Sequence, residues 1–231
     1  DLGNSFVRRQ PVLDVILERL PNTLLLNAFA LLVAVAGGGN GELLAQKLDA
    51  LHGDIRGVIS IGLGGGLSPH LKVGDVVIAD RIITGAESWD CHETWRVRLM
   101  SRVPGAVQGP IFGSDIIIHE AATKTGLFDA TGALVVDMES QVAARFAASR
   151  NLPLAALRVI SDDAGHVLPP AALVAMKPDG RIAIGRVLGS LLRRPGQIPA
   201  LVRTARGSSK AFAELLRCRD LCGVGIAGLD L

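Results

Sequence analysis

Aromatic side chains are scarce in this sequence: it has no tyrosine, and aromatic residues make up 3% of its 231 positions. Proteins that bind single-stranded nucleic acid stack the bases on aromatic rings, so this composition disfavours a nucleic-acid partner. The formal net charge of +2 gives the whole chain no strong attraction to a polyanion. Positive charge is instead concentrated late in the chain, where residues 177–220 contain ten Lys and Arg against three Asp and Glu.

Cysteine is scarce as well, and its placement excludes two kinds of site. Cys91, Cys218 and Cys222 are too few and too scattered for a disulfide framework, and none belongs to a set of His and Cys at zinc-ligand spacing. We therefore expect a reduced, cytoplasmic protein with no metal and no bound cofactor. The adjacent Cys91 and His92 suggest a nucleophile or metal site, but a lone dipeptide defines no geometry. An irregular loop over residues 89–102 is the favoured interpretation.

Long hydrophobic runs are missing too. The longest, residues 24–36, has thirteen residues with Asn27 among them, which is too short to span a bilayer. We expect a soluble protein, or one that touches a membrane surface. The length suits one α/β domain with a substantial core, and no internal repeat or low-complexity linker divides it.

Short apolar segments alternate along the chain with segments of helical periodicity. This alternation, with polar residues just after the apolar segments, is typical of a three-layer α/β fold whose ligands bind at the carboxyl ends of the strands. The strands are expected at residues 31–36, 58–61, 76–79 with an extension over 81–84, 107–118 as a pair, 133–136 and 154–160. The helices are expected at residues 1–22, 42–51, 120–131, 140–150, 182–192 and 199–217.

Glycine is plentiful, and it gathers between two of the expected strands. The run from Gly62 to Gly66 has glycine at four of its five positions. Without Cβ atoms, a loop of this kind brings backbone N–H groups close to an anion or a sugar. A tight turn between two buried strands explains the glycines equally well.

Carboxylates follow two other expected strands at the point where each ends. Asp137 and Glu139 follow one, and Asp162 and Asp163 follow the last. Parallel strands end at one edge of a sheet, so these residues and the glycine run should converge. Desolvation suits one carboxyl group to donate a proton, while an ionised one can stabilise a cationic sugar, the division of labour in glycosidic-bond cleavage. The alternatives are Asp162 as a helix N-cap or loop acid, and Glu139 as a first-turn acid favoured by the helix dipole.

Four motifs, in order, carry a resemblance to a known family. G-L-G-G-G-L-S-P-H-L-K-V-G-D-V-V begins at Gly62, F-G-S-D at Phe112, V-V-D-M-E-S at Val135 and R-V-I-S-D-D-A at Arg158. Together they resemble the purine nucleoside phosphorylase/nucleosidase superfamily, which includes the 5′-methylthioadenosine/S-adenosylhomocysteine nucleosidases. The later stretch L-P-P-A-A-L-V-A-M-K-P-D-G, with R-P-G-Q-I-P-A-L-V-R-T-A-R after it, is similar to one branch, the hopanoid-associated phosphorylases.

The resemblance implies a fold and a domain division. It predicts a three-layer α/β sandwich around a central mixed, mostly parallel sheet, in one domain over residues 31–231. The superfamily normally begins with a strand whose following loop supplies an acid or an anion contact. Residues 1–30 show no such pattern, so they are interpreted as a divergent amino-terminal segment.

The resemblance also implies a role for each matching residue. Asp162 would protonate or hydrogen-bond N7 of a purine, which makes the base a better leaving group, and Ser161 would position it. Glu139 would bind the ribose hydroxyls, with Met138 packed under the sugar or simply filling the core. The other residues assigned to the ribose, the nucleophile or the base are Gly64, Gly65, Ser114, Asp115 and Ile116.

For this branch, the implied reaction is phosphorolysis of adenosylhopane, which releases adenine with phosphate as co-substrate. The glycine run lacks the Ser/Thr and Arg that mark many phosphate sites, so phosphate would rely on backbone N–H groups and one cation. The residues assigned to it are Gly38, Gly39, Gly66 and Arg81. Two alternatives stay open: a hydrolytic nucleosidase acting on methylthioadenosine or adenosylhomocysteine, and a protein that binds a nucleoside without turnover.

A lipid-like 5′ substituent on the nucleoside would bring the enzyme to the inner face of the membrane. The helices expected at 182–192 and 199–217 combine basic residues with apolar stripes, as interfacial helices do, and predict peripheral contact with that surface. An ordinary amphipathic helix with a solvated basic face is the alternative. The family resemblance further predicts a homo-oligomer.

Overall fold

The computed structural model describes residues 31–36, 41–51, 55–169, 190, 193 and 195–223. The helix expected at 1–22, most of the one expected at 182–192, and the candidate phosphate residues Gly38 and Gly39 lie outside these ranges. None of the helices described is long and apolar enough to cross a membrane.

The described part of the chain is built on a seven-stranded sheet. Its strands are β1 Leu31–Ala36, β2 Ile55–Gly66, β3 Val76–Ile83, β4 Ser88–Asp90, β5 Val107–Gly113, β6 Val135–Asp137 and β7 Leu154–Asp162. Six of them lie in the order β1-β2-β6-β5-β3-β4, and β7 pairs with both β2 and β3. Pairings β1–β2, β2–β7, β3–β5 and β5–β6 are parallel, whereas β2–β6, β3–β4 and β3–β7 are antiparallel. The predicted mixed, mostly parallel sheet is therefore confirmed.

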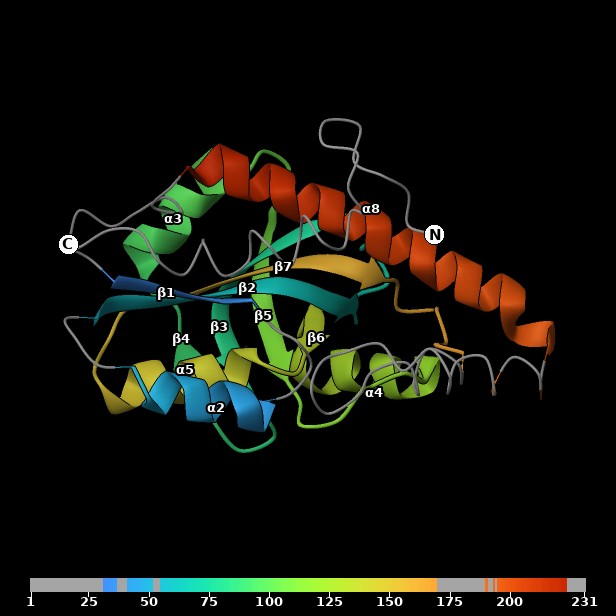
Figure 1. Cartoon of the computed structure of the whole chain (residues 1–231), viewed down its shortest axis with the longest axis horizontal. Coiled ribbons are helices and arrows are strands. Elements are labelled where there is room, and N and C mark those ends of the chain that lie inside the picture. Colours follow the sequence, from blue (N-terminus) through green and yellow to red (C-terminus); the bar gives the residue numbers. More distant parts are fainter. Residues whose placement is uncertain are drawn as a thin grey trace.

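Helices cover both faces of this sheet. They are α2 Gly41–Asp49, α3 Glu93–Arg102, α4 Ala121–Thr131, α5 Ser140–Ser149 and α8 Ile198–Cys222, with a short 3-10 turn, Pro195–Gln197, before α8. Figure 1 shows α3 and α8 on one side of the strands and α2, α4 and α5 on the other. The predicted three-layer arrangement is confirmed.

Consecutive residues of the central strands enter opposite hydrophobic cores, as the period of two in a strand requires. In β2, Val58 packs in the core that includes Ala143 of α5, while Ile59 packs in the core that includes Trp95 of α3. All four side chains are fully buried. A strand that is apolar at every position therefore marks a sheet covered on both faces.

The segment over residues 89–102, predicted to be an irregular loop, is instead strand β4 followed by helix α3. The ring nitrogen Nδ1 of His92 accepts a hydrogen bond from the backbone N–H of Trp95 at 3.4 Å and so caps the helix. Trp95 and Leu99 are fully buried one turn apart, a stripe too short to stand out in a polar sequence. Burial raises the pKa of the Cys91 thiol to about 12, so it does not supply a nucleophilic thiolate near neutral pH.

The glycine run is also different from the predicted loop, because β2 continues through it to Gly66. A Cβ at Gly64 would lie 2.4 Å from the Val135 side chain of β6. Glycine here lets two strands approach closely, which a propensity-based prediction of a turn does not capture. Similarly, residues 107–118 form one strand that ends at Gly113, with no second strand after it.

Candidate active site

The three strand ends that the sequence predicts to converge, those of β2, β6 and β7, lie side by side, and β5 joins them through β6. Gly65 of β2 pairs with Asp162 of β7 on one side and with Val136 of β6 on the other. In the next pairing, Gly113 of β5 lies opposite Asp137 of β6. The three motifs that carry carboxylates or glycines therefore share one edge of the sheet, although β6 runs antiparallel to β2.

Asp162 lies at the centre of this edge and is 8% exposed. Its Oδ1 is 2.7 Å from the hydroxyl oxygen of Ser161, which also lies 3.2 Å from the carbonyl oxygen of Gly64. A Cβ at Gly65 would stand 3.3 Å from Asp162 Oδ2, so the glycine leaves room for the carboxylate. The predicted positioning role of Ser161 has a geometric basis, and Gly65 has a steric role that was not predicted.

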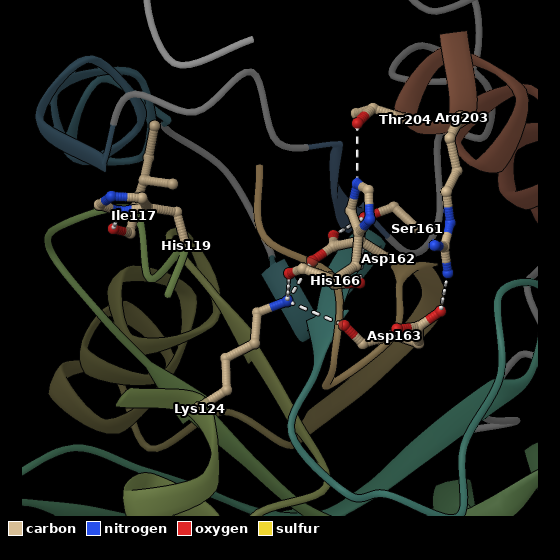
Figure 2. A network of polar contacts seen from close by, with 10 residues as sticks. Ile117, His119, Lys124, Ser161, Asp162, Asp163, His166, Arg203 and Thr204 are labelled. Carbon is tan, nitrogen blue, oxygen red and sulfur yellow. Dashed lines mark hydrogen bonds and ion pairs between the residues drawn. The ribbon is translucent and has the colours of Figure 1, made fainter. Parts of the chain in front are cut away.

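A buried lysine, which we did not predict, occupies the other side of Asp162. Lys124 of α4 is fully buried, and its ammonium donates to Asp162 Oδ2 and to the carbonyl oxygens of Asp163 (3.1 Å) and His166 (3.3 Å) (Figure 2). Lys124 shares an inward stripe of α4 with Leu127, one turn further along. A lysine on an apolar stripe is the signal that could have revealed a buried acidic partner.

Helix α8 braces the loop that follows Asp162. The ring nitrogen Nε2 of His166 is 2.9 Å from the hydroxyl of Thr204, and the Arg203 guanidinium lies 3.3 Å from the Asp163 carboxylate (Figure 2). Burial lowers the pKa of His166 below its usual value, so the neutral ring is favoured. The loop is thus held by α4 from one side and by α8 from the other.

A buried ion pair supports the turn that carries Met138 and Glu139. The Arg158 guanidinium donates to the Asp137 carboxylate, with Nε 2.7 Å from Oδ2, and both side chains are 1% exposed. The same carboxylate accepts the backbone N–H of Ser140 at 3.0 Å, at the start of α5. Met138 and Glu139 follow directly after Asp137, which this ion pair anchors. Glu139 is 8% exposed and Met138 is half-buried.

The segment predicted to back the base is tied to the same turn through Gln141, another residue that was not predicted. Its side-chain amide donates to the carbonyl oxygens of Ser114 (3.0 Å) and Met138 (3.2 Å) and to Asp115 Oδ1 (3.3 Å). Beside them, Ile116 is 68% exposed and presents an apolar side chain to the exterior. The residues assigned to the base and to the sugar therefore belong to one connected structure.

The predicted phosphate residues are separated. Gly66 is in the cluster, since a Cβ there would lie 3.2 Å from the carbonyl oxygen of Asp162. Arg81 is exposed on β3 and lines a different cavity of about 450 Å³. The other lining residues of that cavity are Asp80, Asp90, Cys91, Glu93 and Arg96. Across the described ranges, no group of three or more His, Cys, Asp and Glu side chains could hold a metal ion.

Comparison with known proteins identifies the family. Residues 31–192 match the model of the phosphorylase superfamily. The chain belongs to this superfamily. A 5′-methylthioadenosine/S-adenosylhomocysteine nucleosidase of Mycobacterium tuberculosis is 26% identical over 185 residues, which cover 61% of this chain and 72% of that protein.

Solved structures agree on the fold. The 5′-methylthioadenosine/S-adenosylhomocysteine nucleosidase of Streptococcus pneumoniae with a transition-state inhibitor superposes with a TM-score of 0.51 at 20% identity, covering 77% of this chain and 78% of that one. The S-adenosylhomocysteine nucleosidase of Streptococcus pyogenes gives the same TM-score and identity, over 77% and 76%. The predicted superfamily is confirmed, while the hopanoid-associated branch stays a prediction.

Proposed function

We propose that this member of the phosphorylase superfamily hydrolyses the N-glycosidic bond of a 5′-substituted adenosine and releases adenine. The observation that supports this most is the convergence of two strand-end carboxylates, Asp162 and Glu139, on one edge of the sheet. The 26% identity to a curated 5′-methylthioadenosine/S-adenosylhomocysteine nucleosidase favours the same reaction.

In this proposal, Asp162 acts on the base. It gives a proton or a hydrogen bond to N7 of the purine, so the base leaves as a neutral molecule rather than as an anion. A general acid of this kind contributes about 10²–10⁴ in rate. Ser161 holds one carboxylate oxygen at 2.7 Å, and the missing side chain at Gly65 leaves space beside the other.

Glu139 acts on the sugar. As the glycosidic bond breaks, positive charge develops on the ribose, and a carboxylate that accepts from its hydroxyls stabilises that charge. The ion pair between Arg158 and Asp137, and the bond from the Ser140 N–H to the same carboxylate, fix the backbone on both sides of Glu139 before any substrate binds.

The charges around the site favour water over phosphate as the nucleophile. The two buried cations in the described part of this edge, Lys124 and Arg158, both face carboxylates, Asp162 and Asp137. Arg81, the cation predicted for phosphate, lines another cavity. Among the described residues of this edge, neither buried cation is free to pair with a phosphate dianion, which supports hydrolysis over the predicted phosphorolysis.

Phosphorolysis of adenosylhopane is the second candidate, supported by the resemblance of residues 168–180 and 194–206 to the hopanoid-associated branch. Adenine release from 5′-methylthioadenosine, S-adenosylhomocysteine and adenosylhopane, each with and without phosphate, separates the two. Hydrolysis yields the free sugar at a rate that is independent of phosphate. A strict requirement for phosphate and a sugar 1-phosphate product would contradict hydrolysis, and tight adenine binding without turnover would contradict both.

A further inference from the structure

The ammonium of Lys124 is surrounded by acceptors to an unusual degree. It is fully buried, and its three donors are used by Asp162 Oδ2 and by the carbonyl oxygens of Asp163 and His166. Burying a lysine is costly unless a charge and hydrogen bonds compensate it. Here the compensating charge is the carboxylate to which the general-acid role is assigned, so the pair has a place in the chemistry as well as in the packing.

We propose that Lys124 is a positioning residue for the general acid, an inference that rests on the proposed function. Lys124 fixes the carboxylate rotamer of Asp162 and stabilises the carboxylate that remains once the proton has moved from Asp162 to N7 of the base. The bond electrons between the sugar C1′ and the base nitrogen leave with the base. Water then adds to C1′ and gives up one proton, which replaces the proton that Asp162 lost, so that nucleoside and water become adenine and free sugar.

The geometry places Lys124 where this role requires it. Ser161 and Lys124 hold different oxygens of Asp162, and together they determine the plane of the carboxylate. The two carbonyl contacts connect the same ammonium to the loop that follows, so Lys124 ties the acid to this loop. Lys124 is not placed to touch the reacting atoms itself.

Other charged groups also face Asp162 and must be controlled in a test based on pH. Asp163 and His166 come from the loop after β7, and Arg203 of α8 lies against Asp163. His166 interacts electrostatically with both members of the ion pair, Asp162 and Lys124. The Lys124 variants are therefore measured in the wild-type background and also with His166→Gln, so that the histidine's own titration is separated.

The main test compares Lys124→Met, which removes the charge but keeps the length, with Lys124→Arg, which keeps the charge. Lys124→Met should lower kcat about 10–100-fold, less than the loss of the acid itself, with KM little changed. Lys124→Met removes the positive charge that faces Asp162, so the alkaline limb of kcat/KM should move to higher pH in that variant and stay in place in Lys124→Arg. Lys210→Met is the matched control, because that ammonium bonds only to the Val73 carbonyl oxygen among the contacts seen, at 2.7 Å.

A role in packing alone would lower activity at every pH without moving the limb, and that result would overturn the proposal. Should Lys124→Met fail to fold, the double variant with Asp162→Asn removes both buried charges together. In the Asp162→Asn background, Lys124→Met should then change the remaining rate less than twofold, because Lys124 acts through Asp162. A further tenfold loss there would also overturn it. If the wild-type protein releases no adenine from any of the three nucleosides, that result contradicts the proposed function and, with it, this role of Lys124.

Discussion

Gly207 of α8 lies directly against the carbonyl oxygen of Ser161: a Cβ at position 207 would be 2.6 Å from that oxygen. No real Cβ approaches an oxygen so closely, so any other residue here must push the helix away from the end of β7. Ser161, the residue that Gly207 contacts, directly precedes Asp162 in the chain. Helix α8 therefore determines how the strand end, and the acid on it, are placed.

Gly207→Ala should lower both the melting temperature and the rate of adenine release. In an exposed helix the same change usually stabilises by about 1 kcal/mol, because glycine is a poor helix former. Gly126→Ala in α4 is the matched control, since a Cβ there meets nothing within 4 Å. Thermal unfolding of both variants provides the comparison. Equal stabilisation by the two substitutions would show that α8 does not rest on Ser161.

Much of this edge of the sheet can be predicted from the sequence. Asp162 follows an apolar, β-branched segment directly, and the end of a buried strand in an α/β fold is where a ligand site belongs. The same reasoning places Glu139, and the structure brings both carboxylates to one edge. Local pattern is sufficient here because strand, turn and helix follow within a few residues.

The partners of these residues are harder to predict, because they are distant in sequence. Lys124 is 38 residues from Asp162, so its place on the apolar stripe of α4 indicates a buried acidic partner but does not indicate which one. The glycines of β2 look like a loop, since propensity does not record that Gly64 allows β6 to approach. Helix α3 is missed for a similar reason: its buried stripe consists of Trp95 and Leu99 in an otherwise polar segment.

Glu139→Gln tests the proposed contact with the ribose. Loss of the negative charge should reduce kcat/KM strongly for ribosides and much less for 2′-deoxyribosides, which lack one of the hydroxyls it would bind. Steady-state kinetics on adenosine and 2′-deoxyadenosine derivatives with the same 5′ group provides the comparison. Equal losses on both sugars would argue for a general structural role at the start of α5.

His166 predicts how stability depends on pH. Its pKa is lowered in the folded protein, chiefly by burial, so the unfolded chain binds the proton more readily. Stability should therefore fall as pH drops below the ordinary histidine value of 6.5 and continue to fall until the lowered value is passed. In thermal unfolding, His166→Gln should reduce the loss between about pH 7.5 and 5.5. An unchanged dependence of stability on pH in His166→Gln would contradict this.

Contact of α8 with a membrane surface stays a prediction that the exposed residues of the helix make testable. Ile198, Val202, Phe212 and Leu216 are each 41–47% exposed and recur at helical spacing, and Arg206 lies beside them. Such a stripe with flanking cations suits an anionic surface. An ordinary amphipathic helix remains the alternative.

Sedimentation with anionic vesicles measures this directly. Binding should weaken with salt, with Arg206→Glu and with Phe212→Ser, and neutral vesicles should bind little. Arg203 and Lys210 are unsuitable for charge reversal, because they bond to Asp163 and to the Val73 carbonyl oxygen in the fold. Failure to bind either kind of vesicle would leave α8 as a covering helix only.

The most direct test of the proposed chemistry compares adenine release by Asp162→Asn and Asp163→Asn on 5′-methylthioadenosine. Asp162→Asn keeps the shape but removes the transferable proton, so kcat should fall about 10²–10⁴-fold. Asp163 lies next in the chain, is more exposed, and contacts Arg203 rather than Lys124 through its carboxylate, so Asp163→Asn should retain most of the activity. Near-normal kcat in Asp162→Asn, with activity abolished in Asp163→Asn, would show that the acid has been assigned to the wrong carboxylate.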